Sequence, residues 1–450
     1  MDSPIRNDGV HRVLAWLLVL VVVTAIVVLG RLVPKDAADA GEGTGTASSA
    51  PAATDQQLNA ARIAVGVAYL GQQYAVGSEE LLSGVTEAGA GPVGAVRSAI
   101  VTGQLRDAAA ATEQLSGISF DGDTELAIDV AVLYQNYLEG SDAVAVDQRA
   151  RLLARHGWFA RLAFIHDLPS EHPAREELLS AAAFTAVAVN LGMLAIIGAV
   201  LLGLVVLVFG VVAMAKGRLR LAPQETLSPA YASLFGLYLL GWIVWSLLVS
   251  AVAPVVPEAL TPWLLWVFLP VLGLGGLAWL QLWGITPATA CRQLGLVRGA
   301  GWWREIGAGI LSYLAGLPLV ALALLVGALI GFDEEGAHPV MEELLSGDRN
   351  KLIAGALLAT VFAPVVEEVL FRGALFGHLR GVLGVVLAVI IQGVVFAVIH
   401  PQGAAAIPVL AMLGMVFAFT RAWRGSLIGG IAAHAVHNGM TLCWALLLLG

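Results

Sequence analysis

Charged side chains are scarce in this sequence of 450 residues. Asp, Glu, Lys and Arg together make up 13% of it and hydrophobic residues 58%, whereas about a quarter of an average soluble domain is charged. This composition excludes an ordinary soluble globular protein. We therefore expect an all-α fold, a polytopic bundle of membrane-spanning helices.

Cysteine is nearly absent too. The two that occur, Cys291 and Cys443, lie far apart, and neither belongs to a CxxC spacing. A disulfide framework shows itself as an even set of regularly spaced cysteines, so none is expected here. We interpret both cysteines as small apolar side chains.

Apolar runs of about 20 residues, the length of a helix that crosses a bilayer, recur along the chain. We predict nine spans, at 13–33, 190–214, 230–253, 263–284, 308–331, 352–379, 382–400, 404–420 and 427–448. The first run resembles a signal peptide, but the residues around Ala40 form a weak cleavage site. We therefore expect an uncleaved anchor.

Basic residues in the loops indicate the orientation, because cytoplasmic loops carry an excess of Lys and Arg. They gather after the second, fourth, sixth and eighth spans, at Lys216, Arg218, Arg220, Arg292, Arg298, Arg304, Arg380, Arg421 and Arg424. The loop at 332–351 is acidic instead. Nine spans with a cytoplasmic amino terminus place every basic loop in the cytoplasm and residues 35–189 on the extracytoplasmic side.

The extracytoplasmic segment begins with a low-complexity linker rich in small residues, a composition typical of flexible chain. Helical patterns follow at 58–75, 93–115, 124–138 and 147–165. Between Lys35 and Ser180 there are 20 acidic and 9 basic residues, which favours solubility or the docking of an unknown protein partner. The divisions that we predict are 1–34 (anchor), 35–58 (linker), 59–189 (acidic helical domain), 190–299 (transmembrane helices two to four with cytoplasmic loops) and 300–450 (the membrane domain with the polar residues described next).

The sixth span contains three charged residues, Glu367, Glu368 and Arg372. A charge in the hydrocarbon region costs at least about 2.5–3.5 kcal/mol, so such residues face the bundle interior and usually mark a functional site. Residues four apart share one face of an α-helix, so Glu368 is expected to pair with Arg372. Glu367 is turned about 100° away and is left as the free carboxylate.

Two later spans carry histidines. His400 ends the seventh span, one turn after Phe396, and in the ninth span His434 and Asn438 share a face with His437 to one side. Each group alone is compatible with hydrogen bonds between membrane helices, but together with the three charges they indicate one intramembrane site. A straight seventh helix would carry His400 about 27 Å from its start, so the depth of this histidine stays open.

These residues resemble the motifs of the CPBP family of intramembrane proteases, also called Abi, which includes the CAAX prenyl endopeptidases. The family motifs EExxxR, FxxxH and HxxxN correspond, in the same order, to Glu367–Arg372, Phe396–His400 and His434–Asn438. Each motif alone is weak, while the ordered set of three is specific. The resemblance covers about residues 300–450 and says nothing about residues 1–230.

The resemblance implies an endopeptidase that hydrolyses a peptide bond of a membrane-associated substrate, either a membrane protein or a prenylated or otherwise lipid-anchored peptide. It implies that Glu367 is the general base, assisted by His400, and that His434 and Asn438 stabilise the oxyanion. The supporting residues would be Glu368, Arg372, Phe396 and His437. No cofactor and no nucleic-acid partner are expected, and the lipid bilayer is the surrounding medium.

Three alternatives remain open from the sequence. His434 and His437 with His400 and a glutamate offer zinc ligands, although there is no HExxH motif. A non-proteolytic Abi-type membrane scaffold or immunity protein would keep the same polar helices for packing. A transporter would show an inverted repeat or paired broken helices, and we find neither in the sequence.

Overall fold

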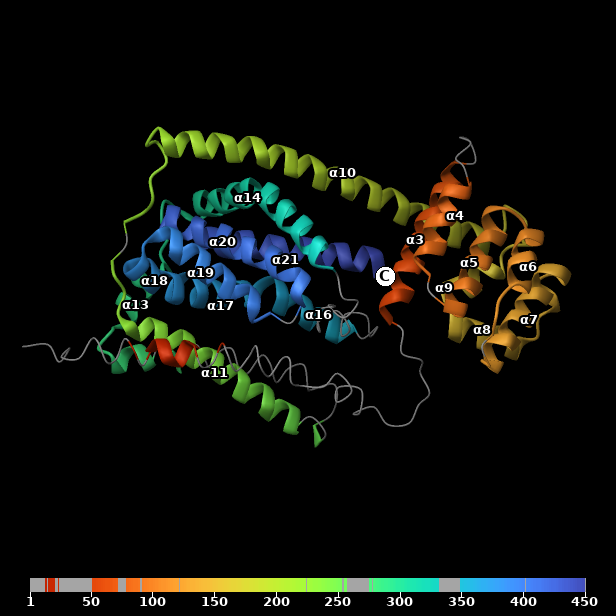
Figure 1. Cartoon of the computed structure of the whole chain (residues 1–450), viewed down its shortest axis with the longest axis horizontal. Helices are drawn as coiled ribbons and strands as arrows, with labels where there is room; N and C mark the ends of the chain where they lie inside the picture. Colours follow the sequence, from red (N-terminus) through yellow and green to blue (C-terminus); the bar gives the residue numbers. More distant parts are fainter. Residues whose placement is uncertain are drawn as a thin grey trace, which may run out of the picture. The chain divides into compact units, whose positions relative to one another are not determined.

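The structure is a computed structural model of the whole chain. It describes Val13, 15–20, Val23, 51–71, 78–89, 91–120, 122–223, 225–252, 255–256, 275–276, 278–331, 349–400 and 402–449. Within these ranges every regular element is a helix (Figure 1). The expected all-α class is confirmed.

The chain forms two compact units. The small unit comprises Thr46–Ile196 with Trp444–Gly450, and the membrane unit comprises Met1–Gly45 with Ile197–Cys443. Two of the boundaries fall inside helices, α10 (Pro173–Ala215) and α21 (Ile428–Leu449). The linker and domain limits predicted from the sequence stay predictions.

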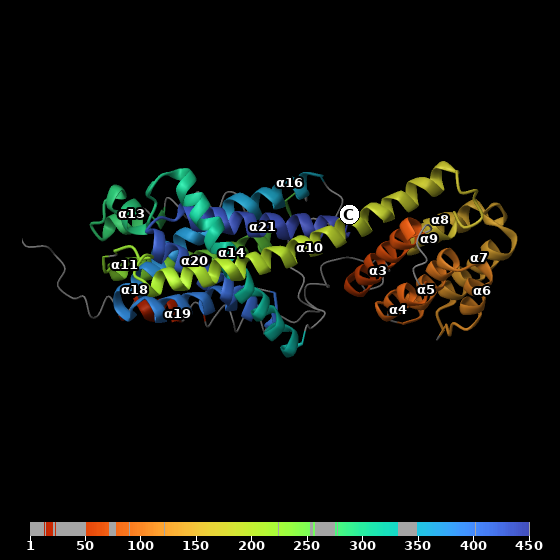
Figure 2. The ribbon, with the colours of Figure 1, turned by 90° about the horizontal axis from the view of Figure 1, so that it is seen from above.

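Short helices build the small unit (Figure 2). They are α3 (Pro51–Leu70), α4 (Ser78–Glu87), α5 (Gly91–Leu105), α6 (Ala108–Ser116), α7 (Thr124–Glu139), the 3₁₀-helix η2 (Ser141–Ala143), α8 (Val146–His156) and α9 (Trp158–Ala163), followed by the start of α10. The helix expected over 93–115 is interrupted at Asp107, whose carboxylate caps α6 by accepting from the Ala110 N–H. The helix expected over 147–165 is interrupted at Gly157, which has φ 52°.

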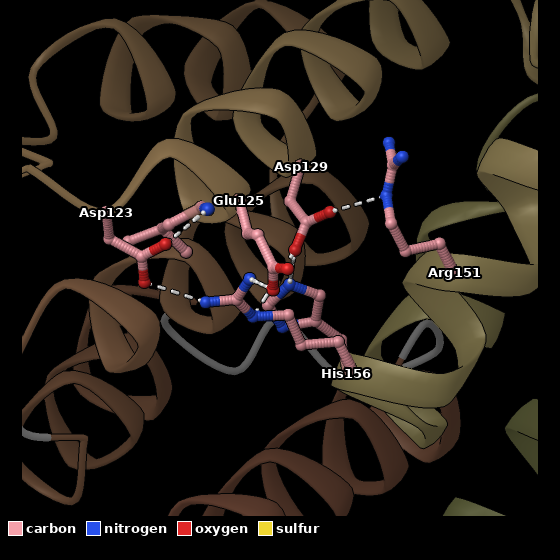
Figure 3. A network of polar contacts seen from close by, with 7 residues as sticks. Asp123, Glu125, Asp129, Arg151 and His156 are labelled. Atoms are coloured by element: carbon pink, nitrogen blue, oxygen red, sulfur yellow. Dashed lines mark hydrogen bonds and ion pairs between the residues drawn. The ribbon is translucent and has the colours of Figure 1, made fainter. Parts of the chain in front are cut away.

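A buried polar network ties α7 to α8 in the small unit (Figure 3). Asp129 is fully buried, and its Oδ2 lies 3.2 Å from Nε2 of the equally buried His156. Arg151 and Arg155 approach the same carboxylate at 3.4 and 3.5 Å. An unpaired buried charge is costly, so these contacts hold the two helices together.

Asp129→Ala should destabilise the small unit by about 1–3 kcal/mol, because it leaves a buried imidazole without its partner. Hydrogen exchange of α7 and α8 in the full-length protein, in detergent, measures the loss. Glu125→Ala is the matched control, since Glu125 is 81% exposed and pairs with Arg155 at the surface; its effect should stay below about 1 kcal/mol. Equal exchange in the two variants would contradict the assignment.

The helices of the membrane unit follow the carboxyl-terminal part of α10. They are α11 (Pro229–Val252), α13 (Pro287–Leu294), α14 (Trp302–Ile330), α16 (Arg349–Leu357), the π-helix η5 (Leu358–Phe362), α17 (Ala363–Glu367), the π-helix η6 (Glu368–Leu375), α18 (Phe376–Leu383), α19 (Val385–Val398), the 3₁₀-helix η7 (Ala404–Ala406), α20 (Ile407–Arg424) and α21 (Ile428–Leu449). The run from α16 to α18 carries the charged motif.

Five helices among the described residues are long and apolar enough to cross a membrane: Pro173–Ala215, Pro229–Val252, Trp302–Ile330, Leu352–Leu383 and Ala404–Arg424. Helix α19 is apolar but shorter. The spans expected at 13–33 and 263–284 fall largely outside the described residues, so the count of nine is not confirmed. The chain is an integral membrane protein.

Helices of the membrane unit approach one another closely at glycines. A Cβ on Gly309 of α14 would lie 2.0 Å from the carbonyl oxygen of Gly429 in α21, and one on Gly393 of α19 would lie 2.7 Å from the Ala411 carbonyl oxygen in α20. Small residues allow such approaches in membrane bundles. Consequently α19 runs beside α20, and α20 also packs on α14 (Figures 1 and 2).

A buried ion pair fixes α14 to the last turn of α20. Both oxygens of Glu305 accept from the Arg424 guanidinium, at 2.9 and 2.8 Å, and the carboxylate is fully buried. Such a bidentate pair fixes geometry as well as charge. Arg424 was interpreted from the sequence only as a loop cation, so its structural partner is a new finding.

Candidate active site

The charged motif lies where an α-helix changes to a π-helix. Glu367 is the last residue of α17, and Glu368 and Arg372 belong to η6. Nη1 of Arg372 lies 2.9 Å from Oε1 of Glu368, and both side chains are fully buried. The pair expected from the spacing is therefore confirmed.

Aromatic rings surround the Arg372 guanidinium. Its central carbon lies 4.5 Å from the ring centre of Phe396, 5.2 Å from that of Phe417 and 5.7 Å from that of Phe371. Its Nη2 also donates to the Gly414 carbonyl of α20 at 3.4 Å. Ring faces attract a cation, so this enclosure compensates part of the hydration that the arginine loses on burial.

Glu367 lies between two imidazoles. Its Oε2 is 3.9 Å from Nε2 of His400 and 3.8 Å from Nε2 of His434, and it accepts no hydrogen bond. The side chain is 24% exposed, in contrast to the fully buried Glu368. The three predicted residues from three helical segments are thus brought together around one carboxylate oxygen.

The short length of α19 explains how His400 reaches the glutamate. The predicted span began at 382, but Gly384, with φ 78°, precedes the helix, which ends at Val398 after 14 residues. His400 follows in a turn, and its Nδ1 lies 2.5 Å from the Phe396 carbonyl oxygen. A carbonyl only accepts, so Nδ1 carries the hydrogen and Nε2 is the ring nitrogen that faces Glu367.

Glu368 also binds His434, a contact that the sequence reasoning missed. Nδ1 of His434 lies 3.1 Å from the same oxygen, Oε1, that faces Arg372. Phe417 of α20 stacks on the imidazole, with 5.0 Å between ring centres and 24° between planes. Phe417 belongs to no motif, and its place beside the site depends on the packing of α20 against α21.

The other polar residues of α21 contact different neighbours. Nδ2 of Asn438 donates to the Ala359 carbonyl in η5 at 2.8 Å, and Nδ1 of His437 lies 3.0 Å from the Tyr313 hydroxyl in α14. Asn438 is therefore held beside the segment that precedes the glutamates. Tyr313 is a further residue that the sequence did not single out.

A metal centre has no obvious set of ligands here. Within the described part of the chain, no group of three or more His, Cys, Asp or Glu side chains has the arrangement of a metal site. The Nδ1 atoms of both central imidazoles are engaged, by Phe396 and by Glu368.

Gly430 of α21 leaves the space that the Glu368 side chain occupies. A Cβ on Gly430 would lie 2.7 Å from Oε2 of Glu368, whereas one on Gly439 of the same helix would have its nearest neighbour at 3.9 Å. Gly430→Ala should lower the free energy of unfolding by about 1–3 kcal/mol through overpacking. Gly439→Ala should leave the thermal midpoint unchanged or slightly raised. If both variants melt at the same temperature in detergent, the crowding at Glu368 is refuted.

No curated protein and no solved structure matches the chain. A protein-family model does match: residues 349–440 fit the family described as Type II CAAX prenyl endopeptidase Rce1-like. The matched range contains Glu367, His400 and His434, the three residues that converge in the structure. The segment that holds this site therefore belongs to the CPBP, or CAAX prenyl protease-like, family of membrane proteases.

Proposed function

We propose that this protein is an intramembrane endopeptidase in which Glu367 and His400 activate a water molecule for attack on a peptide bond. The observation that carries the proposal is the carboxylate oxygen of Glu367, which accepts no hydrogen bond and faces two imidazole Nε2 atoms. A general base needs such a free acceptor within reach of the proton that it removes.

The distances suit a reaction through water. The 3.9 Å between Glu367 Oε2 and His400 Nε2 exceeds a direct hydrogen bond, but one water molecule can bridge two polar atoms at such a separation. Glu367 takes a proton from this water while the resulting hydroxide bonds to the substrate carbonyl carbon. The same proton passes from Glu367 to the leaving amine as the C–N bond breaks, so no covalent enzyme intermediate is needed.

His434 supports the oxyanion in this proposal. Because Nδ1 faces the Glu368 carboxylate, His434 donates from Nε2 only when both ring nitrogens carry hydrogen. Glu368 holds the His434 ring in this orientation, so it assists catalysis as well as pairing with Arg372. Asn438 donates one amide hydrogen to the Ala359 carbonyl. In this proposal its second amide hydrogen is donated to the oxyanion. One preorganised donor contributes about 10²–10³-fold.

The proposed substrate is a membrane-associated protein or lipidated peptide, in line with the description of the matched family. The proposed orientation is a cytoplasmic amino terminus with residues 35–189 extracytoplasmic, which follows from the basic loops. The acidic balance of that segment is compatible with a protein partner of the small unit.

Glu367→Gln should lower the rate of cleavage by about 10²–10⁴-fold, because an amide cannot accept the proton of the attacking water. The assay uses the purified protein in proteoliposomes with a fluorogenic prenylated CAAX-type peptide and, in parallel, a membrane-anchored peptide. Glu177→Gln, an exposed change in the small unit, is the matched control and should retain the wild-type rate. Cleavage that survives Glu367→Gln would refute the mechanism. Binding phenotypes that persist without any cleavage would favour the scaffold.

Metal chelation tests the remaining chemical alternative. In a non-metal mechanism, dialysis against EDTA or 1,10-phenanthroline should leave the cleavage rate within about twofold of its starting value, because Glu367 and His400 generate the nucleophile without a metal ion. A rate that falls on chelation and returns with added zinc would instead establish a metal-dependent protease.

A further inference from the structure

We infer that Pro364 is a positioning residue of the site: it leaves the Ala359 carbonyl without a helical donor, and this carbonyl then orients the amide of Asn438. The inference rests on the proposed function only for its effect on cleavage. The role of Pro364 and the contact between Ala359 and Asn438 are inferred from the hydrogen bonds of the helix alone.

The helix widens immediately before the proline. The Ala363 N–H donates to the carbonyl of Leu358, five residues back, which is the π-helical pattern of η5. In an α-helix that N–H would serve Ala359. In a continuing π-helix the donor to Ala359 would be the N–H of residue 364, and proline has none. Neither pattern supplies Ala359 with a backbone donor.

Asn438 supplies the missing hydrogen bond from another helix. Its Nδ2 lies 2.8 Å from the Ala359 carbonyl oxygen. A carbonyl without a donor is strongly unfavourable in a membrane interior, so the pairing stabilises the contact of α21 with η5. Thr360, next to Ala359, also lies against α21, at 3.9 Å from the Cβ position of Gly439.

The contact with Ala359 determines the direction of the NH₂ group and of the oxygen in the Asn438 side chain. Because a carbonyl accepts only from the NH₂ end, Ala359 fixes the rotation of the Asn438 side chain. The second N–H then has a fixed direction and remains available as a donor. An amide free to turn over would also present its oxygen, and an oxygen repels a developing oxyanion. Asn438 lies one turn after His434, so the same contact fixes the register of both residues.

A double-mutant cycle tests the pairing without reference to activity. In the inactive Glu367→Gln protein, Asn438→Ala should lower the thermal midpoint by about 2–4 °C, the shift expected for one lost hydrogen bond. In the Pro364→Ala background the restored N–H can serve Ala359, so the same change should lower the midpoint by less than half as much. Equal shifts in the two backgrounds would overturn the inference.

A second variant keeps the test independent of how well Pro364→Ala folds. Asn438→Asp has nearly the same size, but its carboxylate cannot donate to Ala359. In the protein with the unchanged Pro364, Asn438→Asp should lower the thermal midpoint at least as much as Asn438→Ala does. If Asn438→Asp has the same thermal midpoint as the protein with the unchanged Asn438, the pairing with Ala359 is overturned.

Cleavage kinetics then test the positioning itself. With the prenylated CAAX-type peptide in proteoliposomes, Pro364→Ala should lower kcat by about 10- to 100-fold and change KM little, because a misoriented group acts on the transition state. Pro318→Ala is the matched control: Pro318 also lies inside a membrane helix, α14, where its ring packs beside Gly203 of α10, so kcat should stay within about twofold. An equal loss of cleavage in the two single variants, Pro364→Ala and Pro318→Ala, would contradict a specific role for Pro364. A wild-type rate in both variants would contradict it as well. Cleavage that persists in Glu367→Gln would refute the proposed function and leave the thermal cycle to decide the pairing.

Discussion

The buried pair of Glu368 and Arg372 is the interaction on which the rest of the site depends. Taking both ions out of water costs several kcal/mol each, and their mutual attraction repays this only when further groups complete the geometry. Here three aromatic rings and the Gly414 carbonyl surround the arginine, and His434 binds the glutamate from α21. These partners belong to η6, α19, α20 and α21, so the pair fixes the relative positions of these four elements. Removing one ion would leave the other unpaired in an apolar environment.

This arrangement explains why two adjacent glutamates behave differently. The arginine is occupied by Glu368, and the backbone turn between the two residues directs Glu367 toward the histidines instead. The hydrogen bonds on Nδ1 of each imidazole hold the rings with Nε2 toward this carboxylate. One short sequence therefore has two results. Arg372 lies four residues after Glu368 and pairs with it, and the adjacent Glu367 keeps a free carboxylate.

Local spacing predicted the parts of the site that depend on one helix. Glu368 and Arg372 lie four residues apart, and this separation brings them together even though the helix is of the π type there. The motif set also predicted that Glu367 meets His400 and His434, but the other contacts between helices were beyond the sequence. Phe417 and Tyr313 have no pattern that distinguishes them from other apolar-helix residues, and the Glu368–His434 bond depends on the register of α21 against η6. The breaks at Asp107 and Gly157 follow known capping and glycine rules, but apolar periodicity continues across both and hides them. The length of α19 depends on Gly384, whose positive φ ends one helix and begins the next.

The two π-helices give a physical reason why this helix, rather than a regular one, holds the site. A π-turn leaves the ordinary hydrogen-bond pattern and is found mostly where function compensates for it. Here η5 and η6 lie on either side of the five residues that end in Glu367. On the amino-terminal side, the altered pattern and Pro364 expose a carbonyl that Asn438 takes up. On the carboxyl-terminal side, the wider turn contains the Glu368–Arg372 pair. The Glu367 carboxylate thus lies between two irregular turns, each of which is held by a residue of α21. Helix α21 therefore both completes the bundle and sets the geometry around Glu367.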